Sequence, residues 1–355
     1  MPPASANAES LAYGRLTIDT AALASNWRTC GARAPRAECA AVVKANAYGI
    51  GIENAVPALA EAGCRTFFVA QVAEAVAVRR LDAEAVIYVL NGLLPGSGDD
   101  HAAHELRPVL GSLDEIREWS AFCAATGWQG GAALHVDTGM SRLGLRMEEA
   151  AALAAEGSSF APSLLMSHFA CADTAGHALN GRQVAAFNTV RGLFPGVRAS
   201  LCNSSGLFLP GDFGFDLVRP GFALYGGNPV PGKPNPMVSV ITLEGRVLAI
   251  RTVSPGESVG YGATWMTSAR PAGDHRRRLR RRLFARRFLV RRLRQRDRLY
   301  RRPLLRCRRP YFDGHVRGRH HRPARRNTPS GGLDRTRRRA SPDRRGGAPG
   351  RHGRL

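Results

Sequence analysis

The sequence has very little lysine. Of its 51 basic side chains, only Lys44 and Lys233 are lysines, and the rest are arginines. DNA rich in G and C favours arginine codons throughout, so the scarcity by itself carries little functional information. Basic arms that bind nucleic acids usually mix lysine and serine with their arginines. The near-absence of lysine therefore disfavours that class of protein and draws attention to the few lysines present.

Long apolar runs and paired cysteines are also missing. No run approaches the roughly 18 residues of a membrane span, and the opening "MPPASANAES" lacks the basic and apolar regions of a secretory signal. The seven cysteines are odd in number and include no C-x-x-C pair, which favours free, buried thiols in a reducing compartment over disulfides. We therefore expect a soluble cytoplasmic protein with no membrane partner.

The net charge of +23 is confined to one end of the chain. Residues 270–355 hold 32 arginines and five aspartates, a net charge of +27. Residues 1–269 hold 19 basic and 23 acidic residues, a net charge of −4. The first 269 residues thus have the charge of an ordinary globular protein, and their composition does not indicate a basic surface for binding nucleic acid.

Between residues 14 and 225, short β-rich apolar runs alternate with longer alanine-rich stretches. Strands are predicted at 15–19, 39–44, 66–70, 85–90, 107–110, 132–137, 163–169, 198–202 and 215–221. Helices are predicted at 21–33, 53–63, 72–82, 112–127 and 181–194. This alternation is typical of βαβ units with a parallel sheet. About eight repeats in some 215 residues favour a (β/α)8 TIM-type barrel of the α/β class over a doubly wound open sheet.

The pattern changes twice after the predicted barrel, which we place at residues 12–230. Residues 236–268 show β-branched alternation and a Pro255-Gly256 turn without helical periodicity, and are expected to begin a separate C-terminal β domain. Residues 270–355 then lack isoleucine, methionine, glutamate and lysine. We expect them to form a disordered tail.

Three interpretations of residues 270–355 compete. They could be a nucleic-acid-binding arm, or "RRLFARRFLVRRL" could be an amphipathic membrane helix, or the segment could be an out-of-frame translation of GC-rich DNA. The abrupt onset and the loss of acidic residues and periodicity favour the third. The β domain would then be incomplete, and nucleic acid would bind only nonspecifically through the charge of the tail.

Lys44 ends a predicted strand, and in a parallel barrel such positions lie at the face where catalytic groups gather. A partly desolvated lysine has a lowered pKa and can form a Schiff base with an aldehyde. Taken alone, a lysine at this position is more often a partner in a salt bridge or a phosphate contact. Its neighbours decide between these interpretations.

Six motifs in order resemble the alanine racemase family, the fold-type III enzymes that use pyridoxal 5'-phosphate. They are "KANAYGIG" (44–51), "HVDTGMSRLG" (135–144), "MSHFACAD" (166–173), "NSSG" (203–206), "RPGFALYG" (219–226) and "ESVGYGATW" (257–265). The resemblance covers residues 12–268. It implies a barrel followed by a β domain, a homodimer, and interconversion of L-alanine and D-alanine for peptidoglycan synthesis.

The resemblance also implies a role for individual residues. Lys44 matches the lysine that binds the cofactor and acts as one base, and Arg142 matches the arginine that contacts the substrate carboxylate. The positions that match cofactor contacts are Tyr48, His168, Asn203, Ser204, Arg219, Gly221 and Phe222. Apart from the family, Arg142 could form a structural ion pair and His168 could be a core residue, and Tyr225 is as easily a core aromatic as a site residue.

Arg219 and Tyr261 bear on the type of reaction. An arginine that matches the partner of the cofactor's pyridine nitrogen does not release its proton at usable pH. The ring is then a weaker electron sink, which suits racemisation rather than transamination. Related decarboxylases use a glutamate there. Tyr261 matches the second base, supplied by the partner subunit, although a tyrosine between glycines could also be a turn residue.

The sequence departs from the family pattern at two places. His135 stands where many members have a carbamylated lysine that braces the site arginine, so we expect Arg142 to be positioned by another group. After residue 268 the family's "GYADG"-like turn, substrate-contacting methionine and late phosphate-binding tyrosine are missing, and the last methionine is Met266. An alternative is therefore a catalytically impaired frameshift product that keeps only the cofactor-binding barrel.

Overall fold

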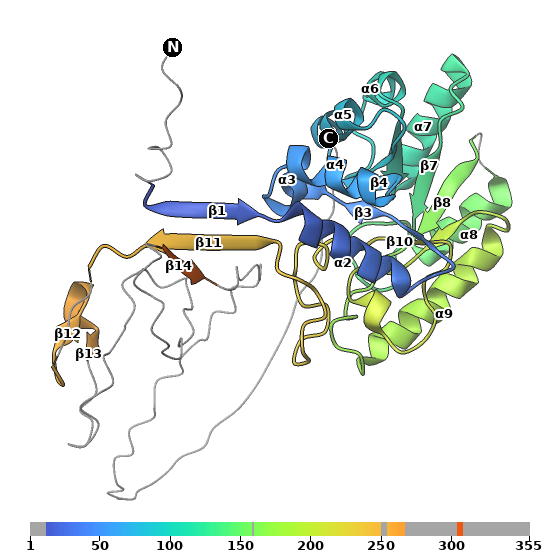
Figure 1. Ribbon diagram of the computed structural model, residues 1–355. Helices are drawn as coiled ribbons and strands as arrows, with labels where there is room; N and C mark the ends of the chain where they lie inside the picture. The colour runs from blue at the N-terminus through green and yellow to red at the C-terminus, as the bar shows by residue number, and fades with distance from the viewer. Residues whose placement is uncertain (1–11, 158–159, 250–253, 267–303, 308–355) are drawn as a thin grey trace, which may run out of the picture. The chain divides into compact units, whose positions relative to one another are not determined.

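The computed structural model describes residues 12–157, 160–249, 254–266 and 304–307. From residue 38 onward, short strands alternate with helices (Figure 1). The strands are β2 (Glu38–Cys39), β3 (Ala41–Val42), β4 (Thr66–Val69), β5 (Val86–Val89), β6 (Leu106–Leu110), β7 (Ala132–His135), β8 (Pro162–Met166), β9 (Ala199–Ser200) and β10 (Leu217–Val218). The helices are α4 (Ile52–Ala62), α5 (Val72–Leu81), α6 (Gly98–Ala103), α7 (Leu113–Thr126), α8 (Met147–Glu156) and α9 (Ala178–Leu193).

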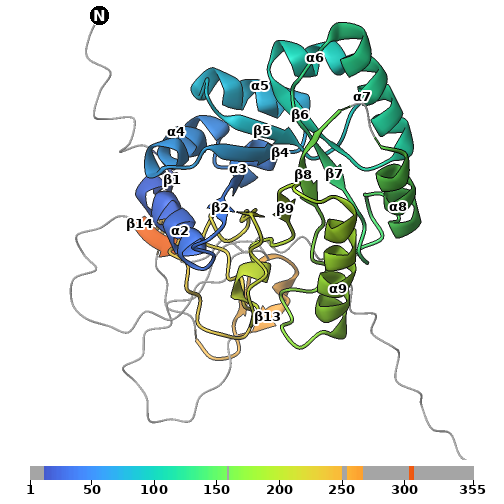
Figure 2. The ribbon, with the colours of Figure 1, turned by 90° about the vertical axis from the view of Figure 1, so that its right-hand side faces the viewer.

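These strands close into a ring surrounded by the helices (Figure 2). Strands β3 to β9 form one parallel sheet in sequence order, and β10 pairs in parallel with β2. The Asp216 N–H donates to the Ala199 carbonyl at 3.0 Å, which joins β10 to β9. Strands β2 and β3 are two halves of one strand separated by Ala40, so the ring has eight strands. The predicted (β/α)8 barrel is confirmed, and the doubly wound alternative is wrong.

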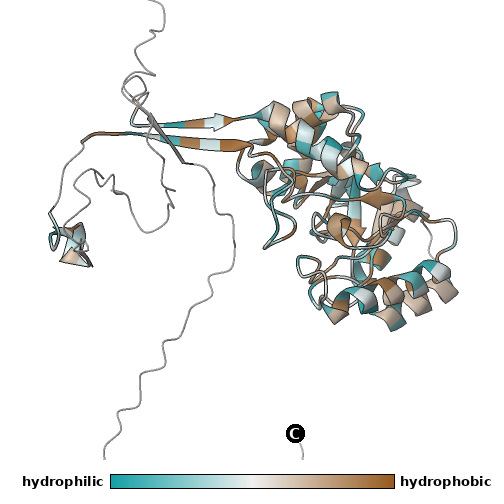
Figure 3. Cartoon of the chain, turned by 60° about the horizontal axis from the view of Figure 1, so that its bottom comes forward, coloured by the Kyte–Doolittle hydropathy of each residue, from teal (hydrophilic) through white to brown (hydrophobic). Residues whose placement is uncertain are grey.

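Alternation along the strands divides the apolar side chains between two layers. On β4, Phe67 packs outward in the large cluster under the helices, whereas Phe68 packs into the barrel interior. The interior cluster also contains Tyr88, Val109 and Leu164 from three other strands. Because both strand faces are covered, the strands are continuous apolar runs, as parallel sheets require. Figure 3 shows hydrophobic and hydrophilic colour alternating along the helices, as expected for helices with one buried face.

The predicted helices agree with the observed ones to within a few residues, and local capping explains where two of them begin. Asp19 accepts a hydrogen bond from the Ala22 N–H at 2.8 Å at the start of α2 (Thr20–Ala32). Ser112 caps α7 through the Glu115 N–H at 3.3 Å. The sequence did not predict α6 and α8, nor α3 (Lys44–Tyr48), which is described below.

The predicted strand at 15–19 is observed, but it is not a barrel strand. It forms β1 (Gly14–Ile18), which pairs antiparallel with β11 (Ile241–Arg246) in a separate sheet. The Arg15 Nε donates to the Glu244 carboxylate at 2.8 Å across this pair. Apolar periodicity gives the strand but not its partner, so it could not show that the first strand belongs with the predicted β segment.

The β segment at 236–268 also contains a short hairpin, β12 (Ser258–Val259) with β13 (Trp265–Met266). Within the arginine-rich segment 270–355, the structure describes the backbone of β14 (Leu304–Cys307), which pairs antiparallel with β11. The expectation of a disordered tail otherwise concerns residues that lie outside the described part of the chain.

The six cysteines whose side chains the structure describes are free thiols, and all but Cys171 are buried, as predicted. Among the described helices, none has the length and apolar character needed to cross a bilayer.

Candidate active site

Lys44 lies two residues after the end of β3, at the carboxyl end of the barrel strands, and opens the unusual turn α3. Ala45, Asn46, Ala47 and Tyr48 all have left-handed backbone angles, with φ between 52° and 55°. The Ala47 N–H donates to the Val43 carbonyl at 2.8 Å, so the turn is hydrogen-bonded. Non-glycine residues pay a steric penalty in this region, and such strain is concentrated at functional sites.

Glu74, on α5, holds this turn in place from the next βα unit. Its Oε1 accepts the Asn46 N–H at 3.1 Å, and its Oε2 accepts the Ala70 N–H at 2.8 Å. The Asn46 side chain in turn accepts the Ile52 N–H at 2.9 Å. Burial and the positive charge of Arg142 lower the pKa of Lys44, and Glu74 acts in the opposite direction. The hydrogen bonds of Glu74 and Asn46 to this turn were not predicted. For Glu74 the reason is that a glutamate on a helix carries no sequence signal that connects it to Lys44.

Tyr48 lies beside Gly221 and Tyr225, which come from the last βα unit of the barrel. The rings of Tyr48 and Tyr225 stack with centroids 4.5 Å apart. The Tyr225 hydroxyl donates to the Val42 carbonyl at 3.0 Å. A Cβ atom at Gly221 would lie 2.4 Å from the Tyr48 hydroxyl oxygen, so glycine is what allows this approach. Burial raises the pKa of Tyr48 to about 12, which keeps its hydroxyl protonated as a donor.

Ser204 and Asn203 organise the neighbouring loops. The Ser204 hydroxyl oxygen accepts the N–H groups of Gly221 and Ala223 at 3.0 and 3.1 Å. The Asn203 side chain donates to the Phe169 carbonyl at 3.3 Å and accepts the Gly206 N–H at 2.9 Å. Phe222, between the two residues held by Ser204, has an exposed side chain. The structure therefore brings the predicted phosphate-cradle residues into one group.

Arg219 is buried at the centre of the site. Its guanidinium donates to the Ser200 hydroxyl and, at 2.5 Å, to the Ser167 carbonyl, and it lies 3.5 Å from the His168 Nδ1. The guanidinium also lies over the Phe68 ring at 5.9 Å. Burial lowers the pKa of Arg219 to about 10, so the group remains charged at neutral pH. Neither serine was predicted as its partner.

Two histidines next to these cations are held in the neutral form. Burial, Arg219 and Arg142 lower the pKa of His135 to about 4, against a smaller opposing effect of Asp137. Burial and then Arg219, followed by weaker effects of the other cations of the site, lower the pKa of His168 well below its usual range. At neutral pH both rings therefore serve as hydrogen-bonding groups without charge.

Arg142 lies in the loop that follows β7, and this loop is shaped by Asp137. The Asp137 carboxylate accepts the N–H groups of Gly139, Met140 and Ser141, each at 2.8 Å. The Arg142 side chain is exposed. Its charge is nevertheless close enough to Lys44 to lower the pKa of that amine.

Tyr261 is the predicted site residue that the structure does not bring to the others. It opens a short turn (Tyr261–Ala263) between β12 and β13, and its side chain is 103% exposed. No hydrogen bond or ring contact joins it to another residue in the described part of the chain.

The charges of this cluster indicate the kind of ligand that fits it. Lys44, Arg142 and Arg219 are gathered at one end of the barrel, and both neighbouring histidines are neutral. The carboxylates nearby, Glu74 and Asp137, are occupied by backbone N–H groups. The three cations outnumber these two carboxylates, and the remaining positive charge favours anionic groups such as phosphate and carboxylate.

Comparisons with known proteins agree with this arrangement. Residues 18–229 match the model of the alanine racemase N-terminal domain. The chain belongs to the alanine racemase family. It is 56% identical to an alanine racemase of Methylobacterium sp. (strain 4-46) over 253 residues, which cover 71% of this chain and 70% of that protein. It is 48% identical to the alanine racemase of Rhodospirillum rubrum over 271 residues, which cover 75% and 72% of the two chains.

Solved alanine racemase structures also resemble this chain. The enzyme from Bartonella henselae, with covalently bound pyridoxal phosphate, gives a TM-score of 0.67 at 40% identity and covers 72% of both chains. The alanine racemase of Streptomyces coelicolor A3(2) gives a TM-score of 0.66 at 30% identity, covering 74% of this chain and 73% of that chain. The present cluster fits such a cofactor, since it offers a lysine with a lowered pKa for an aldehyde, and Gly221 leaves backbone room beside Tyr48.

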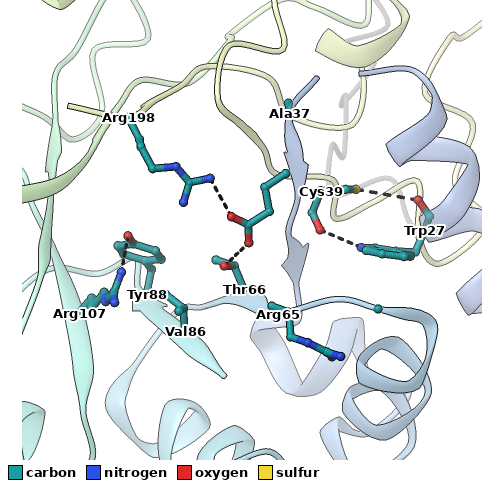
Figure 4. Close-up of a pocket in the computed structure, with 11 residues that line it drawn as sticks. Trp27, Ala37, Cys39, Arg65, Thr66, Val86, Tyr88, Arg107 and Arg198 are labelled. Carbon is teal, nitrogen blue, oxygen red and sulfur yellow. Dashed lines mark hydrogen bonds and ion pairs between the residues drawn. The ribbon is translucent and has the colours of Figure 1, made fainter. Parts of the chain in front are cut away.

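A cavity of about 540 Å³ lies at the other end of this alanine racemase barrel (Figure 4). It is lined at the amino ends of the strands, and its arginines already have partners. Arg198 donates to the Glu38 carboxylate at 2.7 Å, and Arg107 donates to the Tyr88 hydroxyl at 3.2 Å. None of the candidate site residues lines it. Its polar contacts close the base of the barrel, the face that in this fold serves stability.

Proposed function

We propose that this chain is a pyridoxal-phosphate-dependent racemase that interconverts L-alanine and D-alanine in the cytoplasm and supplies D-alanine for peptidoglycan. The observation that carries the proposal is Lys44. It stands at the carboxyl end of a barrel strand with a lowered pKa, beside Arg142 and within a family of alanine racemases. A lysine amine that loses its charge readily is suited both to covalent attachment of an aldehyde and to proton transfer.

The residues around Lys44 would hold the cofactor in one orientation. Tyr48, Ser204 and the backbone at Gly221 and Phe222 would receive its phosphate, and the Gly221 N–H would exchange its bond to the Ser204 oxygen for one to the phosphate. At the other end of the cluster, Arg219 would face the pyridine nitrogen with a proton that it keeps at neutral pH. When bound, the cofactor supplies a sink for the negative charge that develops at the substrate Cα.

Two groups would move the proton on opposite faces of the substrate. The Lys44 Nζ takes the Cα proton from D-alanine, and the Tyr261 hydroxyl returns a proton on the other face to give L-alanine. This leaves Lys44 protonated and Tyr261 as a phenolate, and proton exchange with water would return both groups to their starting forms. In the reverse direction Tyr261 would take the proton and Lys44 would return one. Arg142 would hold the substrate carboxylate by a charge-assisted hydrogen bond.

Tyr261 would serve the site of a second subunit in a homodimer. Its complete exposure supports this proposal, because the side chain is available to another chain. The neutral forms of His135 and His168 also suit the reaction. Additional cations would raise the cost of bringing the protonated Lys44 amine close to Arg142 and Arg219.

The only other lysine provides a matched control for the test. Lys233 is exposed and lies after the barrel. The purified chain should show visible absorbance with pyridoxal phosphate and form D-alanine from L-alanine. Lys44→Ala should lose both, and Lys233→Ala should keep both. Borohydride reduction followed by peptide mapping should place the cofactor on Lys44. Labelling of Lys233 instead, or the absence of visible absorbance in the unsubstituted chain, would refute the proposal.

A second proposal concerns the segment 270–355. Its 32 arginines and absence of glutamate favour an out-of-frame origin, which would leave a cofactor-binding barrel with impaired turnover. Translating the other frames of the gene beyond codon 270 should then give a "GYADG"-like turn and a methionine-bearing strand. If neither frame contains them, the segment is a genuine part of the protein. Chains carrying each tail can be compared for D-alanine formation.

A further inference from the structure

Arg142 depends on its loop for its position. Among the described residues, its guanidinium has no hydrogen-bond or ion-pair partner. The Asp137 carboxylate fixes the shape of the loop by accepting three successive N–H groups. Backbone hydrogen bonds of Leu145 to His135 and Asp137 close the base of this loop, and a further contact is needed to hold its outer part against the barrel.

Thr138 provides this attachment. Its hydroxyl lies 2.7 Å from the Ser167 hydroxyl, at the end of the next strand, and accepts a hydrogen bond from the Gln183 Nε2 at 3.3 Å. All three side chains are buried. Gly139 adds a close approach, because a Cβ atom there would lie 3.1 Å from the Leu179 side chain on α9. The Arg142 loop is therefore attached to both β8 and α9.

Gln183 joins this loop to the segment that carries His168. Its Nε2 also donates to the His168 carbonyl at 2.8 Å, and its Oε1 accepts the Ala170 N–H at 2.9 Å. The side chain is fully buried, and both of its polar atoms are bonded. A buried amide whose hydrogen bonds are all made specifies one arrangement of the groups that it joins.

We propose that Gln183 and Thr138 are positioning residues that set the place of Arg142 relative to His168. Gln183 bonds to the backbone of the His168 segment directly, whereas Thr138 lies in the Arg142 loop and reaches that segment only through the side chains of Ser167 and Gln183. Gln183 reaches His168 only at its backbone carbonyl, and neither Gln183 nor Thr138 has a hydrogen bond to Lys44 in the described part of the chain, so both act through the loops. This inference rests on the proposed function, in which Arg142 receives the substrate carboxylate.

Because Gln183 also bonds to the backbone of the His168 segment, substitutions of the two residues are expected to have different effects on the site. Thr138→Val keeps the shape of the side chain but removes both hydroxyl contacts of the loop. Its affinity for propionate, followed through the visible absorbance of protein-bound pyridoxal phosphate, should fall about tenfold, while the affinity for pyridoxal phosphate stays the same. Gln183→Met should weaken propionate at least as much and should also change the visible spectrum, because the His168 segment is released as well.

Hydrogen exchange gives a readout that needs neither cofactor nor activity. In the full chain without added cofactor, the amides of Gly139, Met140 and Ser141 should exchange about tenfold faster in Thr138→Val than in the unsubstituted protein. Gln129→Met is the matched control, because Gln129 is exposed and, among the residues that the structure describes, its side chain bonds only to the nearby Gly127 carbonyl. It should change neither readout.

The possible outcomes separate this inference from the proposed function. If Thr138→Val lowers the melting temperature but leaves propionate affinity and loop exchange unchanged, the residue is merely structural and the inference is wrong. If the unsubstituted chain takes up no pyridoxal phosphate, the proposed function fails. The exchange of the Arg142 loop then still decides the inference, since unchanged protection in Thr138→Val would overturn it and faster exchange would support it.

Discussion

The buried His135 predicts how stability changes with pH. Its pKa is lowered to about 4 in the folded protein, compared with about 6.5 in an unfolded chain. Because the unfolded state binds the proton more readily, stability is present above pH 6.5 and is lost as the pH falls toward 4. At pH 5 the folded protein keeps His135 neutral, whereas the unfolded chain protonates it, because this pH lies about 1.5 units below the pKa of about 6.5 in the unfolded chain. At about 1.4 kcal/mol per unit, the folded state should lose about 2 kcal/mol through this one residue.

The assay compares the unsubstituted chain with His135→Asn, which cannot titrate in this range. Guanidinium unfolding is followed at pH 7 and pH 5 without pyridoxal phosphate, so that release of the cofactor does not contribute. His168 and His101 also have lowered pKa values, because burial disfavours their charged forms. They titrate in both proteins, and their contribution cancels in the comparison. The unsubstituted chain should lose about 2 kcal/mol more than the variant between the two pH values.

His177→Asn is the control for this experiment. His177 is exposed and caps α9 through its Nδ1, and asparagine can also accept that hydrogen bond. This variant should keep the full acid-dependent loss of stability. If His135→Asn loses as much stability between pH 7 and pH 5 as the unsubstituted chain, burial beside Arg219 does not hold His135 neutral, and the electrostatic description of the site is wrong.

Two further predictions concern backbone geometry. Gly221→Ala should weaken pyridoxal phosphate binding about tenfold or more, because the new Cβ would lie 2.4 Å from the Tyr48 hydroxyl; Gly176→Ala, with no atom within 4 Å, should leave titrations of the visible absorbance unchanged. Ala45→Gly should be neutral or stabilising in guanidinium unfolding, since Ala45 has a φ of 55°, whereas Ala124→Gly in the right-handed helix α7 should cost about 1 kcal/mol. Equal losses in the two alanine variants would contradict the strain assigned to the turn.

The sequence predicted those parts of the fold that depend on local pattern. The apolar runs that form β4 to β8 are fully or largely buried and could be read directly. The same pattern gave β1 as a strand but placed it in the barrel, because pairing with β11, more than 220 residues away by the Gly14–Gly245 register, leaves no local signal. Long-range pairing had to come from the structure.

The candidate site was likewise only partly predictable from the sequence. The resemblance of the motifs to the alanine racemase family named Lys44, Arg142 and Arg219, and the strand pattern added that Lys44 stands at a strand end. The groups that hold them could not be named, because Glu74 and Gln183 lie on helices where a polar residue usually faces water. Their burial and hydrogen bonds depend on how α5 and α9 pack against neighbouring loops. A helix residue gains this kind of role only through tertiary packing.

The left-handed turn at Lys44 is a further feature that depends on tertiary contacts and could not be predicted from the local sequence. The segment "KANAY" (44–48) contains no glycine, so the sequence does not predict a left-handed turn there. Four of its residues nevertheless adopt left-handed angles, which cost each of them about 1–2 kcal/mol in helical geometry. The surroundings must impose the turn, and Glu74 is bonded to the backbone within it. The turn connects the two residues proposed for the ends of the cofactor, Lys44 at its aldehyde and Tyr48 at its phosphate. A relaxed right-handed turn would direct one of them elsewhere, so the strain is best understood as the means by which a single short segment serves both ends.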